Sequence, residues 1–266
     1  MTATRNEIVV FLGPSLAIER ARAHLDAIYR PPAEQGHILE IVRSHRPRAI
    51  VLVDGAFASV PAVRHKEILW ALSRGIEVFG AASLGALRAA ELAGLGMRGY
   101  GFIYRWFRAH PLAEDDEVAV AMTPPALGAA PLSDALIDMR LTFRRAERAG
   151  IITAALRRLA TETASAAHFQ DRSYPNVLET LRRNGPPWAA AALPGFEAWI
   201  RGNAVSQKAL DAEGLLRWIA ALGCGTVRKP GTCFTVTEAF LRDAEAAGLD
   251  VTDLDGDGRS LEWRDP

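Results

Sequence analysis

Ile76-Glu-Val-Phe79-Gly80-Ala-Ala-Ser83-Leu-Gly85-Ala-Leu-Arg88-Ala-Ala-Glu91 is the stretch of sequence that decides the fold. Its first four residues are typical of a buried strand, and the residues after Ser83 are strong helix formers. The stretch therefore predicts a strand, a sharp turn and a helix. Ser83 lies where the strand ends and the helix begins.

Two more apolar runs, Ile8–Leu12 and Ala49–Val53, have the continuous hydrophobic character of buried parallel strands. We expect helices over residues 16–29, 37–45 and 100–107, and a further strand over 118–122. Strands that alternate with helices indicate a parallel sheet with right-handed crossovers. The predicted class is α/β, with a small parallel sheet and flanking helices in the N-terminal half and a mostly helical C-terminal half.

Thr123-Pro124-Pro125 is the expected boundary between two domains, an α/β core over 1–123 and a helical region over 124–266. Amphipathic segments follow this boundary, as in a helical bundle. They are residues 133–149, 151–166, 176–183, 196–201, 206–222 and 235–247.

The ends of the three expected strands carry polar side chains. Ser15, Asp54 and Ser83 each come shortly after an apolar run. Parallel strands end at one edge of their sheet, which is where open α/β sheets bind ligands. We therefore expect these three residues to lie near one another. Asp54 either holds a lysine, binds substrate or only caps a turn.

Ser83 is the candidate nucleophile. The backbone N–H groups that open the next helix, near Leu84 and Gly85, are expected to be unpaired and suited to an oxyanion. The pattern is not the complete G-x-S-x-G elbow, because Ala81 replaces its first glycine. The alternative is that Ser83 only caps the helix.

Lys66 is the candidate base. On a helix its neighbours are all apolar, so the amine loses solvation and its neutral form is favoured. A neutral amine can accept a proton from a serine hydroxyl. The alternative is a lysine that extends to water. The apolar neighbours are Ala62, Val63, Leu69 and Trp70.

Arg88, like Ser15 and Asp54, is a candidate for binding the oxyanion or the substrate. His65, Glu67 and Glu91 are candidates for supporting roles. His65 is adjacent to Lys66 and points about 100° away from it on a helix, so we assign it, with Glu67, to support or partner contact. Arg88 and Glu91 are spaced to pair on one helix face. That pair either orients a carboxylate substrate or the Ser–Lys pair, or is a structural ion pair.

Composition excludes several function classes. Lys plus Arg and Asp plus Glu both total 31, and zero net charge argues against an electrostatic nucleic-acid binder.

No apolar run is long enough for a membrane span and no signal peptide is evident, so we expect a cytoplasmic protein. Cys224 and Cys233 are expected to be free thiols, and we predict no metal site. Asp253-Leu-Asp255-Gly-Asp257-Gly258 resembles a calcium loop, but Arg264 stands where the bidentate Glu belongs.

Seven segments carry a resemblance to a known family. They are Phe-Leu-Gly-Pro-Ser (11–15), Tyr-Arg-Pro-Pro-Ala (29–33), Val-Asp-Gly-Ala-Phe (53–57), His-Lys-Glu-Ile-Leu (65–69), residues 80–92, Gly-Met-Arg-Gly-Tyr-Gly (96–101) and Asp-Asp-Glu-Val-Ala (115–119). On these segments, residues 8–122 resemble the TfuA family, whose members are partners of YcaO enzymes in peptide thioamide formation. Departures from the family pattern are small: Leu84 stands where Met is common, and Tyr100 where a small residue is common.

The resemblance implies a hydrolase that releases sulfide from the thiocarboxylated C-terminus of a small ThiS-like sulfur-carrier protein. The sulfide would serve a YcaO partner, which uses ATP to convert a peptide amide to a thioamide, so the peptide substrate is met only indirectly. Ser83 would attack the thioacyl carbon, Lys66 would accept its proton, and no cofactor is needed. The alternative is a non-catalytic accessory protein that recruits peptide or sulfur carrier to YcaO.

Overall fold

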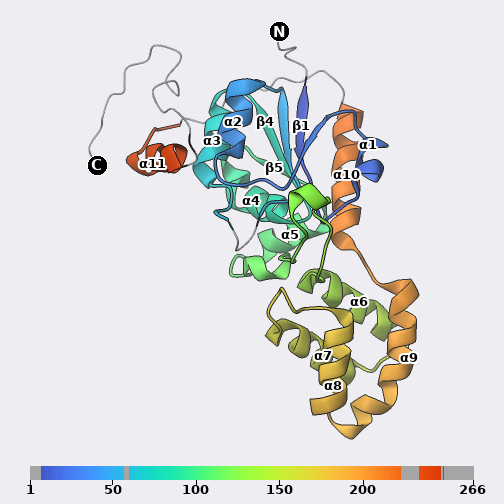
Figure 1. The fold of residues 1–266 in the computed structure, drawn as a ribbon. Coiled ribbons are helices and arrows are strands. Elements are labelled where there is room, and N and C mark those ends of the chain that lie inside the picture. The colour runs from blue at the N-terminus through green and yellow to red at the C-terminus, as the bar shows by residue number, and fades with distance from the viewer. Residues whose placement is uncertain (1–6, 57–59, 223–233, 247, 249–266) are drawn as a thin grey trace.

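The structure is a computed structural model that describes residues 7–56, 60–222, 234–246 and 248 (Figure 1). The two cysteines, Cys224 and Cys233, and the segment that resembles a calcium loop lie outside the described residues.

A five-stranded parallel sheet forms the centre of the N-terminal half, which confirms the predicted fold class. The strand order is β2-β1-β3-β4-β5, so the chain reverses its direction of travel across the sheet between β1 and β3. Ligands of open α/β sheets bind at such a switch point. The strands are β1 (Ile8–Phe11), β2 (Ile28–Arg30), β3 (Ala49–Leu52), β4 (Glu77–Gly80) and β5 (Arg98–Gly99).

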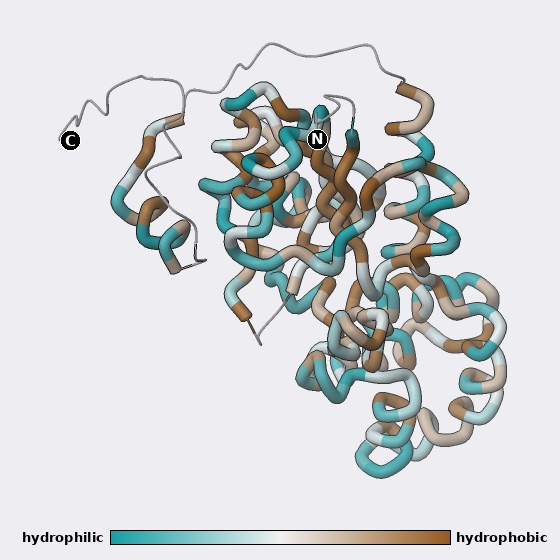
Figure 2. Tube along the Cα trace, turned by 45° about the horizontal axis from the view of Figure 1, so that its top comes forward, coloured by the Kyte–Doolittle hydropathy of each residue, from teal (hydrophilic) through white to brown (hydrophobic). Residues whose placement is uncertain are grey.

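Helices cover both faces of the sheet (Figure 1). Alternate strand residues face opposite layers: Val9 and Ile50 pack in one core cluster, Val10 and Val51 in another. The strands form the most hydrophobic part of the tube in Figure 2. The first cluster includes α2 (His37–Ser44), α3 (His65–Ser73), α4 (Leu84–Leu92) and α11 (Glu238–Ala246), and the second includes α1 (Ile18–Arg22) and α10 (Gln207–Leu222).

A four-helix bundle lies beyond the lower end of the sheet in Figure 1 and has its own core, which includes Phe143 and Phe196. The chain then returns to the sheet through α10, which packs on α5 (Gly101–Ala109). The division after residue 123 stays a prediction, but part of the C-terminal half belongs to the core of the sheet. The bundle helices are α6 (Leu136–Arg148), α7 (Ala154–Ala166), α8 (Tyr174–Asn184) and α9 (Pro187–Asn203).

Secondary structure differs from prediction at four places. Helix α9 begins nine residues before the segment predicted over 196–201. The strand predicted over 118–122 is wrong: η2 (Asp115–Glu117) precedes it, and Met122 forms only an isolated bridge with Pro131. The helix predicted over 16–29 ends at Arg22, and its last part is strand β2 instead. Strand β5 was not predicted. Both missed strands are short edge strands, which form because a neighbouring strand offers hydrogen bonds and not because of strong local propensity.

Candidate active site

The turn between β4 and α4 is shaped by two glycines. A Cβ atom on Gly85 would lie 1.8 Å from the Leu52 carbonyl oxygen, and one on Gly80 would lie 2.0 Å from the Gly85 carbonyl oxygen. Only glycine therefore lets the start of α4 approach β3 and β4 so closely. Ala82 within this turn has a positive φ of 67°, which is uncommon for a residue with a side chain.

Ser83 occupies the N-cap position of α4 and is buried, with 2 % of its surface exposed. Its hydroxyl makes no capping hydrogen bond, so the serine does not perform the structural task that is common at this position. The Gly85 N–H donates to the Val53 carbonyl oxygen (3.3 Å) and is not free to hold an anion. Of the two predicted oxyanion donors, the Leu84 N–H remains.

Ser15 and Asp54 come together at the switch point between β1 and β3, as the strand-end pattern predicts. The Asp54 carboxylate accepts hydrogen bonds from the Gly13 N–H (2.8 Å), the Ser15 N–H (3.1 Å) and the Ser15 hydroxyl (2.6 Å). Both Ser15 and Asp54 are buried. The Ser15 hydroxyl is therefore committed to Asp54, and the pair fixes the loop that follows β1.

The Lys66 side chain contacts the segment just before α11. Its amine donates to the Thr235 carbonyl oxygen (3.4 Å) and lies 5.4 Å from the centre of the Phe234 ring. No hydrogen bond joins it to Ser83, and both residues belong to the described part of the chain. The predicted Ser83–Lys66 pair stays a prediction and has no direct contact in its favour.

Glu67, next to Lys66, is almost fully buried and joins the starts of two helices. Its carboxylate accepts from the Gly36 N–H (2.8 Å) before α2 and from the Arg64 N–H (3.1 Å) before α3. Burial raises the pKa of Glu67 to about 7, although these amide donors oppose the shift. The Glu67 carboxylate therefore holds the start of α2 beside the start of α3, and its supporting role at the site stays a prediction.

His65, Arg88 and Glu91 form one cluster between α3 and α4. The Glu91 carboxylate lies 2.7 Å from His65 Nε2 and accepts from Arg88 Nη1 (2.7 Å), and Arg88 Nε donates to the Val63 carbonyl oxygen (3.1 Å). Burial raises the pKa of Glu91, but the His65 and Arg88 contacts outweigh it and lower that pKa below its ordinary value. The predicted Arg88–Glu91 pair is thus present and ties the two helices together.

A model of the TfuA-like protein family matches residues 54–173. This segment belongs to the TfuA-like family. The match includes Lys66, Ser83 and their neighbours, and it extends into α6 and α7. It begins after the 11–15 and 29–33 segments, so those two parts of the expected resemblance lie outside it. No curated protein matches the chain.

Two residues of the acidic run Asp115-Asp116-Glu117 form ion pairs with arginines. Asp116 accepts from the buried Arg172 (2.5 Å), which also donates to the Ala164 carbonyl oxygen (2.9 Å). Glu117 accepts from Arg140 on α6 through both carboxylate oxygens. These ion pairs join the loop after α5 to the helical bundle. The buried Arg172 guanidinium requires such partners, because an unpaired buried charge is costly.

One residue at the carboxyl edge was missed by sequence reasoning. Lys208, in the first turn of α10, is 3 % exposed, and its amine donates to the Val118 carbonyl oxygen (2.8 Å). A sequence signal was available, since the chain has 31 Lys plus Arg but only three lysines: Lys66, Lys208 and Lys229. Its distance along the sequence from the three expected strand ends gave no reason to place it at this edge.

Neither a metal site nor a membrane span is found in the described part of the chain. No group of three or more His, Cys, Asp or Glu side chains there is placed to hold a metal ion. No helix over the same residues has the length and apolar character needed to cross a membrane.

Proposed function

We propose that this protein hydrolyses the thiocarboxylate of a ThiS-like sulfur carrier, with Ser83 as nucleophile, and so supplies sulfide to a YcaO-type enzyme that thioamidates a peptide. The TfuA-like family is associated generally with YcaO-related thioamidation. The observation that carries the catalytic step is the buried Ser83 hydroxyl, which lies at a strand–turn–helix junction and makes no capping bond.

The reaction divides into two steps. The Ser83 Oγ attacks the thioacyl carbon while an amine accepts its proton, and the C–S bond then breaks to leave an acyl ester on Ser83. The protonated amine returns the proton to the leaving sulfur. Water then cleaves the ester, so one thiocarboxylate and one water give one carboxylate and one hydrogen sulfide. In this proposal the Leu84 N–H stabilises the tetrahedral anion.

The test is sulfide release from a thiocarboxylated carrier by the purified full chain. Ser83→Ala should abolish release, because it removes the attacking oxygen. The control is Ser73→Ala, since the Ser73 hydroxyl only donates to the Trp70 carbonyl oxygen at the end of α3. Unchanged release by Ser83→Ala would remove the proposed activity.

A second function is favoured by the contacts of Lys66. An amine directed to Phe234 and Thr235 suits a non-catalytic accessory protein that recruits peptide or carrier to YcaO. Reconstitution with YcaO, carrier and peptide separates the two functions when sulfide is supplied in excess. An accessory protein still raises thioamide yield under those conditions, even as Ser83→Ala. A protein that only supplies sulfide becomes dispensable.

A further inference from the structure

Lys208 is the buried amine that the predicted site leaves unused. The amine donates a hydrogen bond to the Val118 carbonyl oxygen. The negative charges of two carboxylates also attract it, Asp54 at the end of β3 and Asp138 on α6. Burial lowers the pKa of Lys208 below its ordinary value, and the charges of Asp54 and Asp138 oppose that shift. Burying a lysine amine costs free energy, so we expect this lysine to have a structural or functional role.

The first turn of α10 is held at the carboxyl edge of the sheet by its own contacts. Asp138 accepts from the Gln207 N–H (2.8 Å) and fixes the start of α10. One turn later, Asp211 accepts from the Phe102 N–H (2.9 Å) and the Ile103 N–H (2.7 Å) at the start of α5. Because α5 follows β5 directly, this contact fixes α10 beside the strand ends.

Two observations connect the segments that carry Lys208 and Ser83, although no hydrogen bond joins the two side chains in the described residues. Ala82, which precedes Ser83, and Ala209, which follows Lys208, contribute to the same core cluster on one face of the sheet. In addition, Asp54 acts on Lys208 and is followed by Gly55, where a Cβ atom would lie 2.0 Å from Leu84 Cδ2. The loop that carries Asp54 therefore packs directly against the residue after Ser83.

We propose that Lys208, and not Lys66, is the amine that activates Ser83. This inference rests on the proposed function for its substrate, but it concerns the serine itself and can be tested without the carrier. The neutral Lys208 amine accepts the proton of the Ser83 hydroxyl as Oγ attacks an acyl or phosphoryl centre. The resulting ammonium gives that proton to the leaving group, and its charge is balanced by Asp54 and Asp138.

The competing assignment is a permanently charged lysine that neutralises Asp54 and Asp138. Arginine distinguishes the two, because it keeps the charge and the hydrogen-bond donors but does not lose its proton in proteins. Lys208→Arg therefore preserves a structural cation and removes a base. Lys208→Met has a similar length and removes both.

The experiment measures how fast a fluorophosphonate probe labels Ser83 in the purified full chain, with the site confirmed by peptide mass. Lys208→Met and Lys208→Arg should each slow labelling by about 100-fold or more, the range expected for loss of a general base. Ser73→Ala, whose hydroxyl donates to the Trp70 carbonyl oxygen, is the control and should label at the wild-type rate. Lys66→Met tests the competing base. Thermal melting of each variant establishes that it is folded.

The pH profile gives a readout that a structural role does not move. Wild-type labelling should rise with pH as the Lys208 amine loses its proton, and this rise should be absent from folded Lys208→Arg. The inference is overturned by wild-type labelling and an unchanged pH profile in Lys208→Arg, by loss of labelling in Lys66→Met alone, or by a wild type that is not labelled at Ser83.

The proposed function fails by a different result. The wild type could label at Ser83 in a Lys208-dependent manner and yet release no sulfide from thiocarboxylated carrier. That result would support Lys208 as the activating amine and would contradict the proposed substrate. Sulfide release that depends on Ser83 and Lys66, with Lys208→Arg fully active, supports the proposed function and overturns the assignment of Lys208.

Discussion

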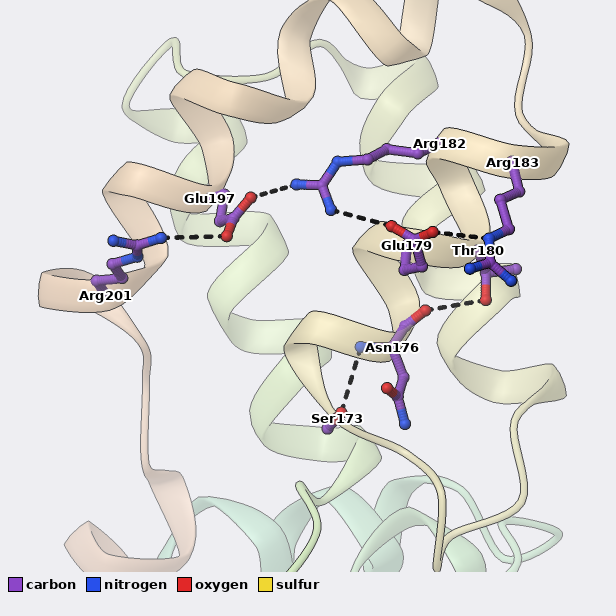
Figure 3. Close-up of polar contacts among 8 residues, drawn as sticks. All are labelled: Ser173, Asn176, Glu179, Thr180, Arg182, Arg183, Glu197 and Arg201. Atoms are coloured by element: carbon purple, nitrogen blue, oxygen red, sulfur yellow. Dashed lines mark hydrogen bonds and ion pairs between the residues drawn. The ribbon is translucent and has the colours of Figure 1, made fainter.

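The carboxyl edge of the sheet and the surface of the helical bundle use the same residue types in opposite ways. At the edge, Asp54 and Lys208 are buried and bonded to backbone or hydroxyl groups. On the bundle, Glu179 pairs with Arg182 and Arg183, and Arg182 also pairs with Glu197, which Arg201 contacts as well (Figure 3). Those bundle side chains are exposed to solvent.

The difference indicates which charged groups contribute strongly to the free energy of unfolding and which contribute little. A buried charge whose partner is removed remains costly, because water cannot replace the partner. An exposed ion pair is screened by water and salt and contributes little. The network in Figure 3 therefore links α8 to α9 without being a site, and the edge is where substitutions should matter.

The largest effect is expected for Asp54→Ala. The substitution leaves the Gly13 and Ser15 N–H groups and the Ser15 hydroxyl without their acceptor, and it removes a charge that acts on Lys208. We expect a loss of about 3–5 kcal/mol in the free energy of unfolding, measured by urea titration. Exposed Asp115→Ala is the control and should change it by less than about 0.5 kcal/mol. Equal effects would contradict the comparison.

Gly85→Ala should follow closely. The added Cβ atom would lie 1.8 Å from the Leu52 carbonyl oxygen, so α4 must move away from β3. We expect a loss of about 3 kcal/mol, near the upper end for overpacking, with reduced labelling of Ser83. Gly195→Ala in α9 is the matched control, because its Cβ atom meets nothing within 4 Å and alanine favours a helix. A Gly85→Ala protein as stable as wild type would show that the turn is not held by this contact.

Glu67→Gln should change the pH dependence of stability. The pKa of Glu67 is raised from 4.5 to about 7 in the folded state, so the folded protein binds more protons than the unfolded chain between these values. Its contribution is fully present below pH 4.5 and is lost as pH rises through 7. The full shift corresponds to a loss on the order of 3 kcal/mol over this window.

Thermal melting between pH 4 and 8 measures this loss, and Glu67→Gln should flatten it because glutamine does not titrate. Asp138 also has a pKa raised by burial, to about 6, but it is present in both proteins and cancels in the difference. Identical pH profiles for wild type and variant would assign the slope to other groups.

The smallest effect is expected on the bundle surface. Glu179→Gln removes the ion pairs with Arg182 and Arg183, both of which are exposed. The free energy of unfolding should change by less than about 0.5 kcal/mol, and the difference should vanish in high salt. A change as large as that of Asp54→Ala would mean that exposure does not separate the two regions.

The central strands and the turn before α4 were predictable because their signals are local. Continuous apolar runs marked β1 and β3, and the strand-like residues 76–79 followed by helix formers marked β4 and the turn that carries Ser83. Adjacent strand ends also predicted the meeting of Ser15 with Asp54. Such features depend on backbone periodicity and on steric limits that a few neighbouring residues set.

Tertiary structure alone decided where the amines of Lys66 and Lys208 lie. Helical spacing gave Lys66 apolar neighbours but did not show that its amine faces Phe234 and Thr235. Lys208, 125 positions after Ser83 (208 − 83), reaches the sheet edge only because α10 returns to it after the bundle. Local sequence determines which side chains a strand end or a helix presents. Long-range packing determines which buried charged groups lie close to one another.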